Sequence, residues 1–140
     1  MKLLFDFLPL ILFFATFRYA EGKWSVKEVL GHVLDTERVF AYRALRFGRN
    51  DPTVLSSMDQ DLFMSTKPFD HLPLSAICQE FALVRQSSLH FFRNLPAACW
   101  DNKGSTGENH MSVRSLAFML AGHDIHHREV VRTRYLPAMA

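Results

Sequence analysis

Apolar residues recur three and four positions apart over residues 26–47, which is the spacing of one buried helix face. This stripe consists of Val26, Val29, Val33, Phe40 and Ala44. Directly before it, Ser25 and Glu28 have the spacing of a capping box, in which each side chain bonds the other residue's backbone N–H. Gly48 follows the stripe, where a helix end is expected. The pattern therefore predicts a helix from Val26 to about Phe47.

Two further apolar stripes predict helices over residues 73–95 and 113–135, with Ser112 placed to cap the last one. No segment alternates apolar and polar residues for long enough to indicate a strand. Residues 102–109 are polar and are expected to form a loop, and residues 48–72 are expected to form a long connection. The chain is therefore predicted to be all-α, a small bundle of nominally four helices.

The apolar N-terminal segment, residues 1–20, stands apart from this pattern because 15 of its residues are apolar. Its apolar run is shorter than the about 20 residues that span a bilayer, and no small-residue cleavage site follows it. Three interpretations remain open: an export signal or membrane anchor, a buried first helix, and an aberrant N-terminus from a misplaced start. We therefore treat residues 1–20 separately from a helical domain over residues 21–140.

The length, net charge and cysteine content of the chain limit the classes of function that it can have. The chain has 140 residues, which suits one domain, and its 16 Lys and Arg against 14 Asp and Glu leave a formal charge of +2. That balance gives no electrostatic case for nucleic-acid binding. Cys78 and Cys99 form no CxxC pair, so a reducing compartment fits, and we expect a cytoplasmic protein. The alternative is a chain that is exported or anchored to a membrane through residues 1–20.

Histidines carry the strongest chemical signal. His123 and His127 lie four residues apart, so one helix face presents both imidazoles. Both also fall in the apolar stripe, where an imidazole without a partner is costly and a bound cation removes that cost. His32, on the first predicted helix, is the strongest candidate for a third ligand. The residues leave two alternatives open: a polar surface run near a helix end, and a pair in which His126 replaces His127.

Several separate segments, taken in order, resemble the DinB-like (YfiT-type) metal-binding family over about residues 17–136. These segments are Gly22–His32, Asp35–Arg38, Asp59–Asp61, Ser112–Ala117 and Ala121–His127. The resemblance implies a four-helix bundle with a divalent metal, commonly zinc or nickel, held by three histidines. Carried over to this chain, those ligands are His32, His123 and His127.

The chain departs from the family at residues 1–16, which do not resemble the family's long first helix. We therefore expect an atypical or truncated first helix. A shortened bundle would leave apolar surface exposed, which favours a homodimer.

Three neutral imidazoles would leave an open position on the metal, as in catalytic sites. Relatives in the family include transferases and isomerases that use low-molecular-weight thiols. The resemblance therefore implies a metal-dependent thiol transferase acting on a small molecule, or a hydrolase. Asp124 and Asp61 are the candidate catalytic residues, and Asp35, Thr36 or Asp124 could orient the imidazoles. The alternative is a non-catalytic metal-binding bundle with a stress-related or structural role, associated with a membrane through residues 1–20.

Overall fold

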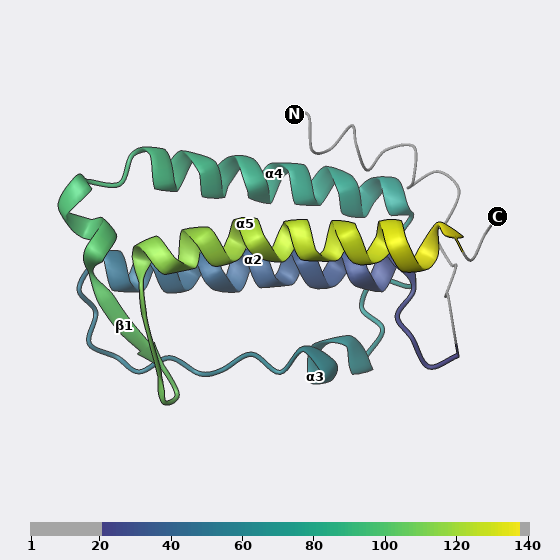
Figure 1. Cartoon of the computed structure of the whole chain (residues 1–140), viewed down its shortest axis with the longest axis horizontal. Helices are drawn as coiled ribbons and strands as arrows, with labels where there is room; N and C mark the ends of the chain where they lie inside the picture. The colour runs from purple at the N-terminus through teal and green to yellow at the C-terminus, as the bar shows by residue number, and fades with distance from the viewer. Residues whose placement is uncertain (1–20, 138–140) are drawn as a thin grey trace.

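The computed structural model describes residues 21–137 and is built around three long helices. They are α2 (Val26–Gly48), α4 (Leu74–Arg93) and α5 (Val113–Val130). Figure 1 shows the three side by side, and α2 packs against both of the others. The predicted all-α fold and the three helix positions are confirmed. The expectations for residues 1–20 fall outside the described part of the chain.

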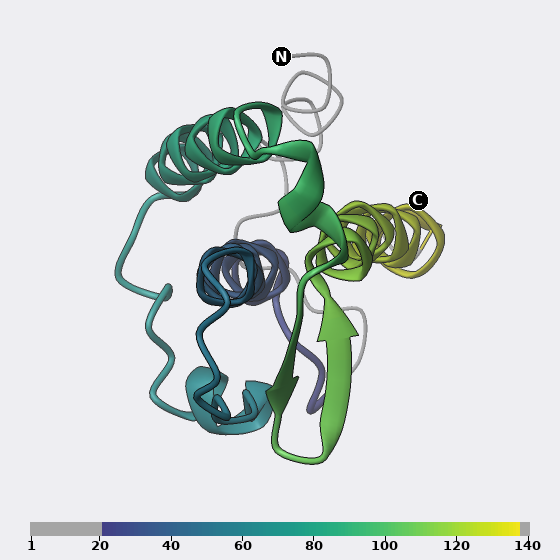
Figure 2. The ribbon, with the colours of Figure 1, turned by 90° about the vertical axis from the view of Figure 1, so that its left-hand side faces the viewer.

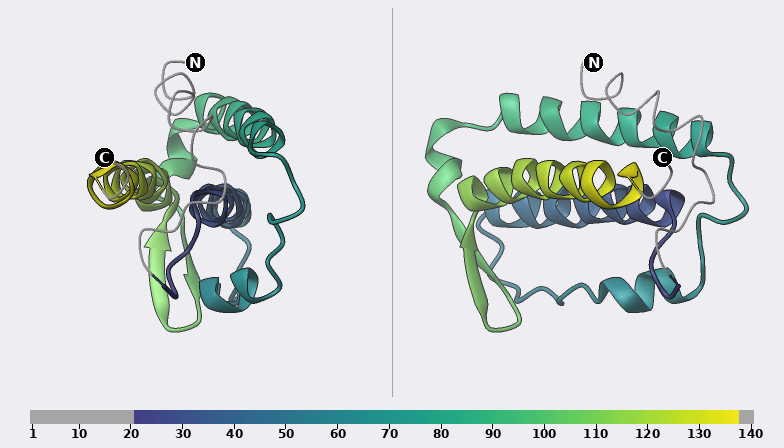
Figure 3. Two further views of the ribbon diagram at one scale, coloured as in Figure 1. Left: turned by 90° about the vertical axis from the view of Figure 1, so that its right-hand side faces the viewer. Right: turned by 45° about the vertical axis from the view of Figure 1, so that its right-hand side comes forward.

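The connection between α2 and α4 returns along the whole length of α2 (Figures 1 and 3). As a result α2 and α4 run in the same direction, and α5 runs antiparallel to both. This connection was predicted as a loop, but it contains the short helix α3 (Gln60–Ser65). The carboxylate of Asp59 caps α3 by accepting from the N–H groups of Asp61 and Leu62, each at 3.0 Å. Seen end on in Figure 2, α3 lies on the side of α2 that faces away from α4.

The helix starts follow from local capping. Ser25 N–H donates to the Glu28 carboxylate at 2.6 Å, and Glu28 N–H donates to the Ser25 hydroxyl at 3.2 Å. The predicted capping box of α2 is thereby confirmed. Ser112 caps α5 as predicted, and its partner is Ser115, whose hydroxyl accepts from the Ser112 N–H at 2.9 Å.

The prediction of a strandless loop over residues 102–109 is wrong. After the 3₁₀ helix η1 (Ala97–Asp101), an antiparallel hairpin is formed by β1 (Lys103–Thr106) and β2 (Asn109–Ser112). Leu55, from the long connection, supports it by donating to the Ser105 carbonyl at 2.9 Å and accepting from the Gly107 N–H at 3.0 Å. The strands are four residues long and depend on this distant segment, so alternation in the sequence could not reveal them.

The last helix is shorter than predicted. α5 ends at Val130, and a π-helical turn, η2 (Val131–Tyr135), follows it. The Tyr135 hydroxyl donates to the Trp24 carbonyl at 2.6 Å. This bond joins the turn that follows α5 to the beginning of α2.

The described core has three clusters: one between α2 and α4 around Leu34 and Ile77, a second between α2, α5 and the hairpin around Phe47 and Leu116, and a third between the start of α2 and η2 around Tyr135. α2 contributes to all three clusters, so it is the central element of the described structure. Within residues 21–137, no helix is long and apolar enough to cross a bilayer.

Candidate metal centre

Three histidine side chains, one from α2 and two from α5, come together where these two helices pack against each other. His32 comes from the first half of α2, and His123 and His127 come from successive turns of α5. The Nε2 atom of His123 lies 3.0 Å from that of His32 and 3.1 Å from that of His127. One nitrogen from each ring falls within 4.8 Å of the others. The residues predicted as metal ligands are therefore brought together by the fold.

Burial keeps these rings neutral. It is the main cause that lowers the pKa of His32 from 6.5 to about 4, and the neighbouring His123 adds to it. Burial and the surrounding histidines lower the pKa of His127 to about 3. The pKa of His123 is lowered as well, by burial and then by His126. At neutral pH the site therefore presents the unprotonated imidazoles that a metal ion requires.

The arrangement of the three nitrogens fits a cation. Each Nε2···Nε2 contact needs a proton on one ring, and neutral rings that all point their Nε2 lone pairs inward repel one another. A divalent ion accepts all three lone pairs at once and removes that conflict. Imidazole nitrogens suit zinc, nickel, copper and iron, so the donor set fits a divalent transition metal without selecting one of them.

The side chains predicted to orient the imidazoles do not reach them. Within the described residues, the buried Nδ1 atoms of His32 and His127 have no hydrogen-bond partner. The Thr36 hydroxyl contacts the Met58 sulfur at 4.0 Å, and Asp35 lies 4.0 Å from Arg38. The expectation that Asp35 or Thr36 holds a ring nitrogen is therefore wrong for this structure.

Asp124 also faces a different partner from the one expected. Its carboxylate pairs with Arg85 of α4, and the same guanidinium bonds both oxygens of Glu37 on α2, at 2.8 and 2.9 Å. Glu37 and Asp124 are buried, and burial raises the pKa of Asp124. This network joins all three long helices next to the histidines. Within residues 21–137, Asp124 is thus hydrogen-bonded to the bridging Arg85 and to none of the imidazoles.

Aromatic rings border the histidines on two sides. The Trp24 ring centroid lies 5.0 Å from that of His32, and the Phe40 ring centroid lies 6.4 Å from that of His123. The exposed His126 stacks edge-on against His127 at 5.1 Å but does not belong to the cluster. Of the two possible pairs on α5, the structure thus selects His123 with His127.

Two cavities open onto the centre. The larger, of about 610 Å³, is bordered by His32 and His123 and also by Arg43 and His110. The smaller, of about 350 Å³, is bordered by His127 and by Asp61, an exposed carboxylate of α3. The long connection contributes to both, because Gln60 lines each of them. A small molecule can therefore approach the histidines by more than one route.

Sequence reasoning missed Arg43 and His110 as cavity residues. Arg43 could have been found, because it continues the α2 stripe of His32, Thr36 and Phe40 at helical spacing, where a charged residue is unexpected. His110 could not, because it lies on the hairpin that the sequence did not predict.

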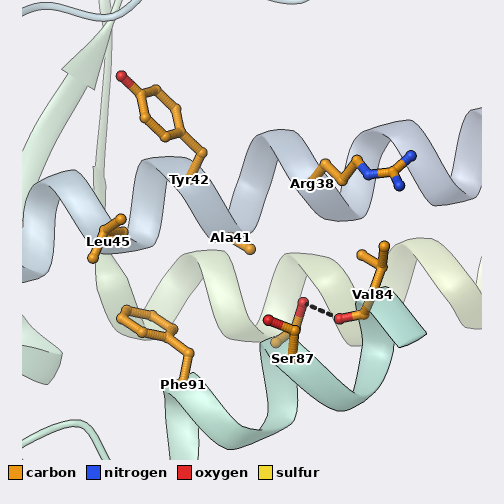
Figure 4. A pocket seen from close by; sticks show the side chains of 8 residues that line it. Arg38, Ala41, Tyr42, Leu45, Val84, Ser87 and Phe91 are labelled. Atoms are coloured by element: carbon orange, nitrogen blue, oxygen red, sulfur yellow. Dashed lines mark hydrogen bonds between the residues drawn. The ribbon is translucent and has the colours of Figure 1, made fainter. Parts of the chain in front are cut away.

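A further hollow, of about 450 Å³, lies between α2 and α4 (Figure 4). Its walls are mainly apolar, with Leu45, Val84 and Phe91 among them. The Ser88 hydroxyl there donates to the Val84 carbonyl of its own helix at 3.1 Å. None of the described residues that line it is a histidine, cysteine or carboxylate, so its lining lacks the usual ligands of a metal ion.

Comparisons with known proteins agree with this picture. A family model described as the DinB superfamily matches residues 14–131. Among solved structures, the chain is similar to YfiT from Bacillus subtilis, described as a probable metal-dependent hydrolase with an unusual four-helix bundle topology. The TM-score is 0.70 at 14% identity, and the match covers 84% of this chain and 71% of YfiT. At that identity the likeness shows the fold alone. None of the curated proteins matches the chain.

Proposed function

The chain belongs to the DinB superfamily, and from that premise we propose that it is a metal-dependent enzyme whose ion is held by His32, His123 and His127. The observation that carries the proposal is the convergence of three neutral Nε2 atoms from two helices. A three-nitrogen donor set leaves a coordination position open, which is typical of catalytic zinc sites. Zinc or nickel is the metal we propose.

We propose two reactions in order of preference: transfer of a small molecule to or from a low-molecular-weight thiol, and hydrolysis. When bound, the ion would supply Lewis acidity, which lowers the pKa of a coordinated thiol or water. Two cavities that both border the histidines favour the transfer reaction, because it needs room for a thiol and for a second substrate.

The chain's own residues have distinct parts in this proposal. Trp24 and Phe40 flank the imidazoles and reduce the access of water to them. Asp61 shares the smaller cavity with His127, and we assign to its carboxylate the acceptance of a proton from the attacking group. Asp124 is held by Arg85, so we assign to it the alignment of the helices and no proton transfer.

Metal content tests the proposal first. The protein is purified without a chelator or a histidine tag, and its metals are counted by elemental mass spectrometry. We expect about one equivalent of zinc or nickel in the wild type and background levels in the triple variant His32→Ala, His123→Ala, His127→Ala. The exposed His126→Ala variant is the matched control and should keep the metal. A folded wild type without metal contradicts the proposed centre.

Turnover is tested on the metal-loaded protein with a screen of thiol-transfer and ester or amide hydrolysis reactions. We expect activity that is lost in the triple variant and lowered about 10²-fold or more in Asp61→Asn, the usual range for a general base. Full activity in Asp61→Asn would remove that residue's proposed role. Metal binding without turnover would leave the non-catalytic metal-binding bundle as the better description.

A further inference from the structure

Arg43 is a buried, positively charged residue to which the proposed function assigns no role. It is 6% exposed and lies on the face of α2 that also carries His32, Thr36 and Phe40. All four residues line the larger cavity. Burial lowers the pKa of the guanidinium, but arginine stays charged at any physiological pH. The cavity wall therefore holds a permanent positive charge.

The contacts of Arg43 leave that charge without a counter-ion in the described structure. One of its terminal nitrogens donates to the Ser56 carbonyl at 2.9 Å, and its guanidinium carbon lies 5.7 Å from the centre of the Phe40 ring. Five other arginines of residues 21–137 pair with carboxylates: Arg38, Arg46, Arg85, Arg114 and Arg132. The described arginines that have no ion pair besides Arg43 are all more exposed than it is: Arg49, Arg93, Arg128 and Arg134. A buried guanidinium without an acid is costly, which points to an anion from outside the chain.

The rest of the cavity has the character expected of a pocket for an anionic molecule. None of the described residues that line it is Asp or Glu. Met58, Met111 and Met119 supply flexible apolar walls. The cavity therefore has a positive charge at Arg43, apolar walls at Phe40 and the methionines, and uncharged polar groups such as Thr36 and Ser115.

The position of Arg43 relative to the histidines sets the shape of the ligand. Arg43 lies eleven residues after His32, a rise of about 16 Å along the helix, and long helical side chains lean back toward the N-terminus. The Phe40 ring stands between them, 5.7 Å from the guanidinium carbon and 6.4 Å from the His123 ring centroid. A ligand that reaches both ends would lie along Phe40.

We propose that Arg43 binds the carboxylate of a small molecule whose reacting end lies at the three-histidine centre. The inference rests on the proposed function and extends it by naming the substrate class: a carboxylic acid with an apolar segment between the acid and the reacting group. The planar fork of arginine matches a carboxylate with two parallel hydrogen bonds. A carboxylate carries one negative charge, which a single guanidinium balances, whereas a phosphate carries nearly two.

The test compares ω-mercaptoalkanoic acids of increasing length with their methyl esters and with the matching phosphonates. Binding to metal-loaded and to metal-free protein is measured by calorimetry and by NMR, following the Nε–H resonance of Arg43. We expect the best acid to bind about 10- to 100-fold more tightly than its ester, as for a charge-assisted pair, and to shift that resonance. The wild-type resonance supplies a readout that needs no substitution.

Two variants locate the effect. In Arg43→Gln the preference for the acid over the ester should fall below about threefold, and in Arg43→Lys it should persist in part, because the charge remains but the fork is lost. Arg49→Gln removes the same charge from an exposed position at the end of α2 and should keep the full preference. Circular dichroism confirms that each variant is folded.

The outcomes separate this inference from the proposed function. Metal-loaded wild type that binds acid and ester equally overturns the role of Arg43 and leaves the metal centre standing. A protein that holds no metal but still prefers the acid, with the Arg43 resonance shifted, overturns the metal centre and supports the anion site. Tighter binding of the phosphonate than of the acid overturns the assignment of a carboxylate.

Discussion

Gly31 shows how a single residue next to the candidate centre shapes it. A Cβ atom at this position would lie 2.2 Å from the ring of Phe69, which is buried against α2. The absence of a side chain lets the long connection between α2 and α4 pack directly beside His32. The same connection supplies Met58 and Gln60 to the larger cavity. A residue without chemistry of its own thus helps to form the walls of the site.

We expect Gly31→Ala to destabilise the protein by about 1–3 kcal/mol, the usual cost of forcing an extra methyl group into a packed core. Gly122→Ala is the matched control, since nothing lies within 4 Å of its Cβ position and alanine favours a helix. Urea unfolding followed by circular dichroism gives both free energies. Equal stability of Gly31→Ala and the wild type would show that Phe69 does not pack tightly against α2.

At the scale of the elements, Arg85 connects the three long helices. It bonds Glu37 of α2 and Asp124 of α5 from its position on α4. Asp124 directly follows His123, and Glu37 lies five residues after His32. The network therefore sets the spacing of the two helices that carry the histidines, although it does not touch an imidazole in the described structure.

Removal of Arg85 should lower the stability strongly, because it leaves the buried carboxylates of Glu37 and Asp124 without their positively charged partner. We expect Arg85→Met to lower the free energy of unfolding by about 3 kcal/mol. Arg38→Met is the control: its pair with Glu80 is solvent-exposed, and its loss should cost less than about 1 kcal/mol. Chemical denaturation at neutral pH measures both. Similar small losses in the two variants would mean that the buried network contributes no more than a surface pair.

For the molecule as a whole, the histidine cluster makes stability depend on pH. In the unfolded chain the histidines titrate near 6.5, whereas in the folded chain His32 and His127 stay neutral down to about 4 and about 3. Between these values the unfolded state binds more protons than the folded state. The contribution of these neutral histidines to the stability of the metal-free protein is therefore fully present above about pH 6.5 and is lost as the pH falls toward the folded pKa values.

We expect metal-free wild type to unfold at a lower denaturant concentration at about pH 5 than at about pH 7.5, because of this difference in proton binding. The triple histidine-to-alanine variant should show a smaller decrease, and His126→Ala should behave like the wild type. Guanidinium titrations at the two pH values provide the measurement. An identical decrease in the triple variant would assign the pH dependence to other groups.

The sequence by itself determined the features that depend on contacts between residues close to one another in the chain. The boundaries of α2 and the start of α5 could be predicted because Ser25, Glu28 and Ser112 cap neighbouring backbone groups. Helical spacing indicated that His123 shares a helix face with His127 or with His126, and the structure selected His127. Family resemblance and helix patterning together indicated His32 as the third member, and the fold places it there.

Tertiary structure decided everything that depends on segments distant in the chain. Leu55 bonds the hairpin from the long connection, Asp124 of α5 pairs with Arg85 of α4, and Arg43 lines a cavity formed by four separate segments of the chain. Such contacts join residues tens of positions apart, and no local pattern encodes the partner of a buried charge. The physical reason is that burial, which sets both the cost of a charge and the pKa of an imidazole, is a property of the packed molecule.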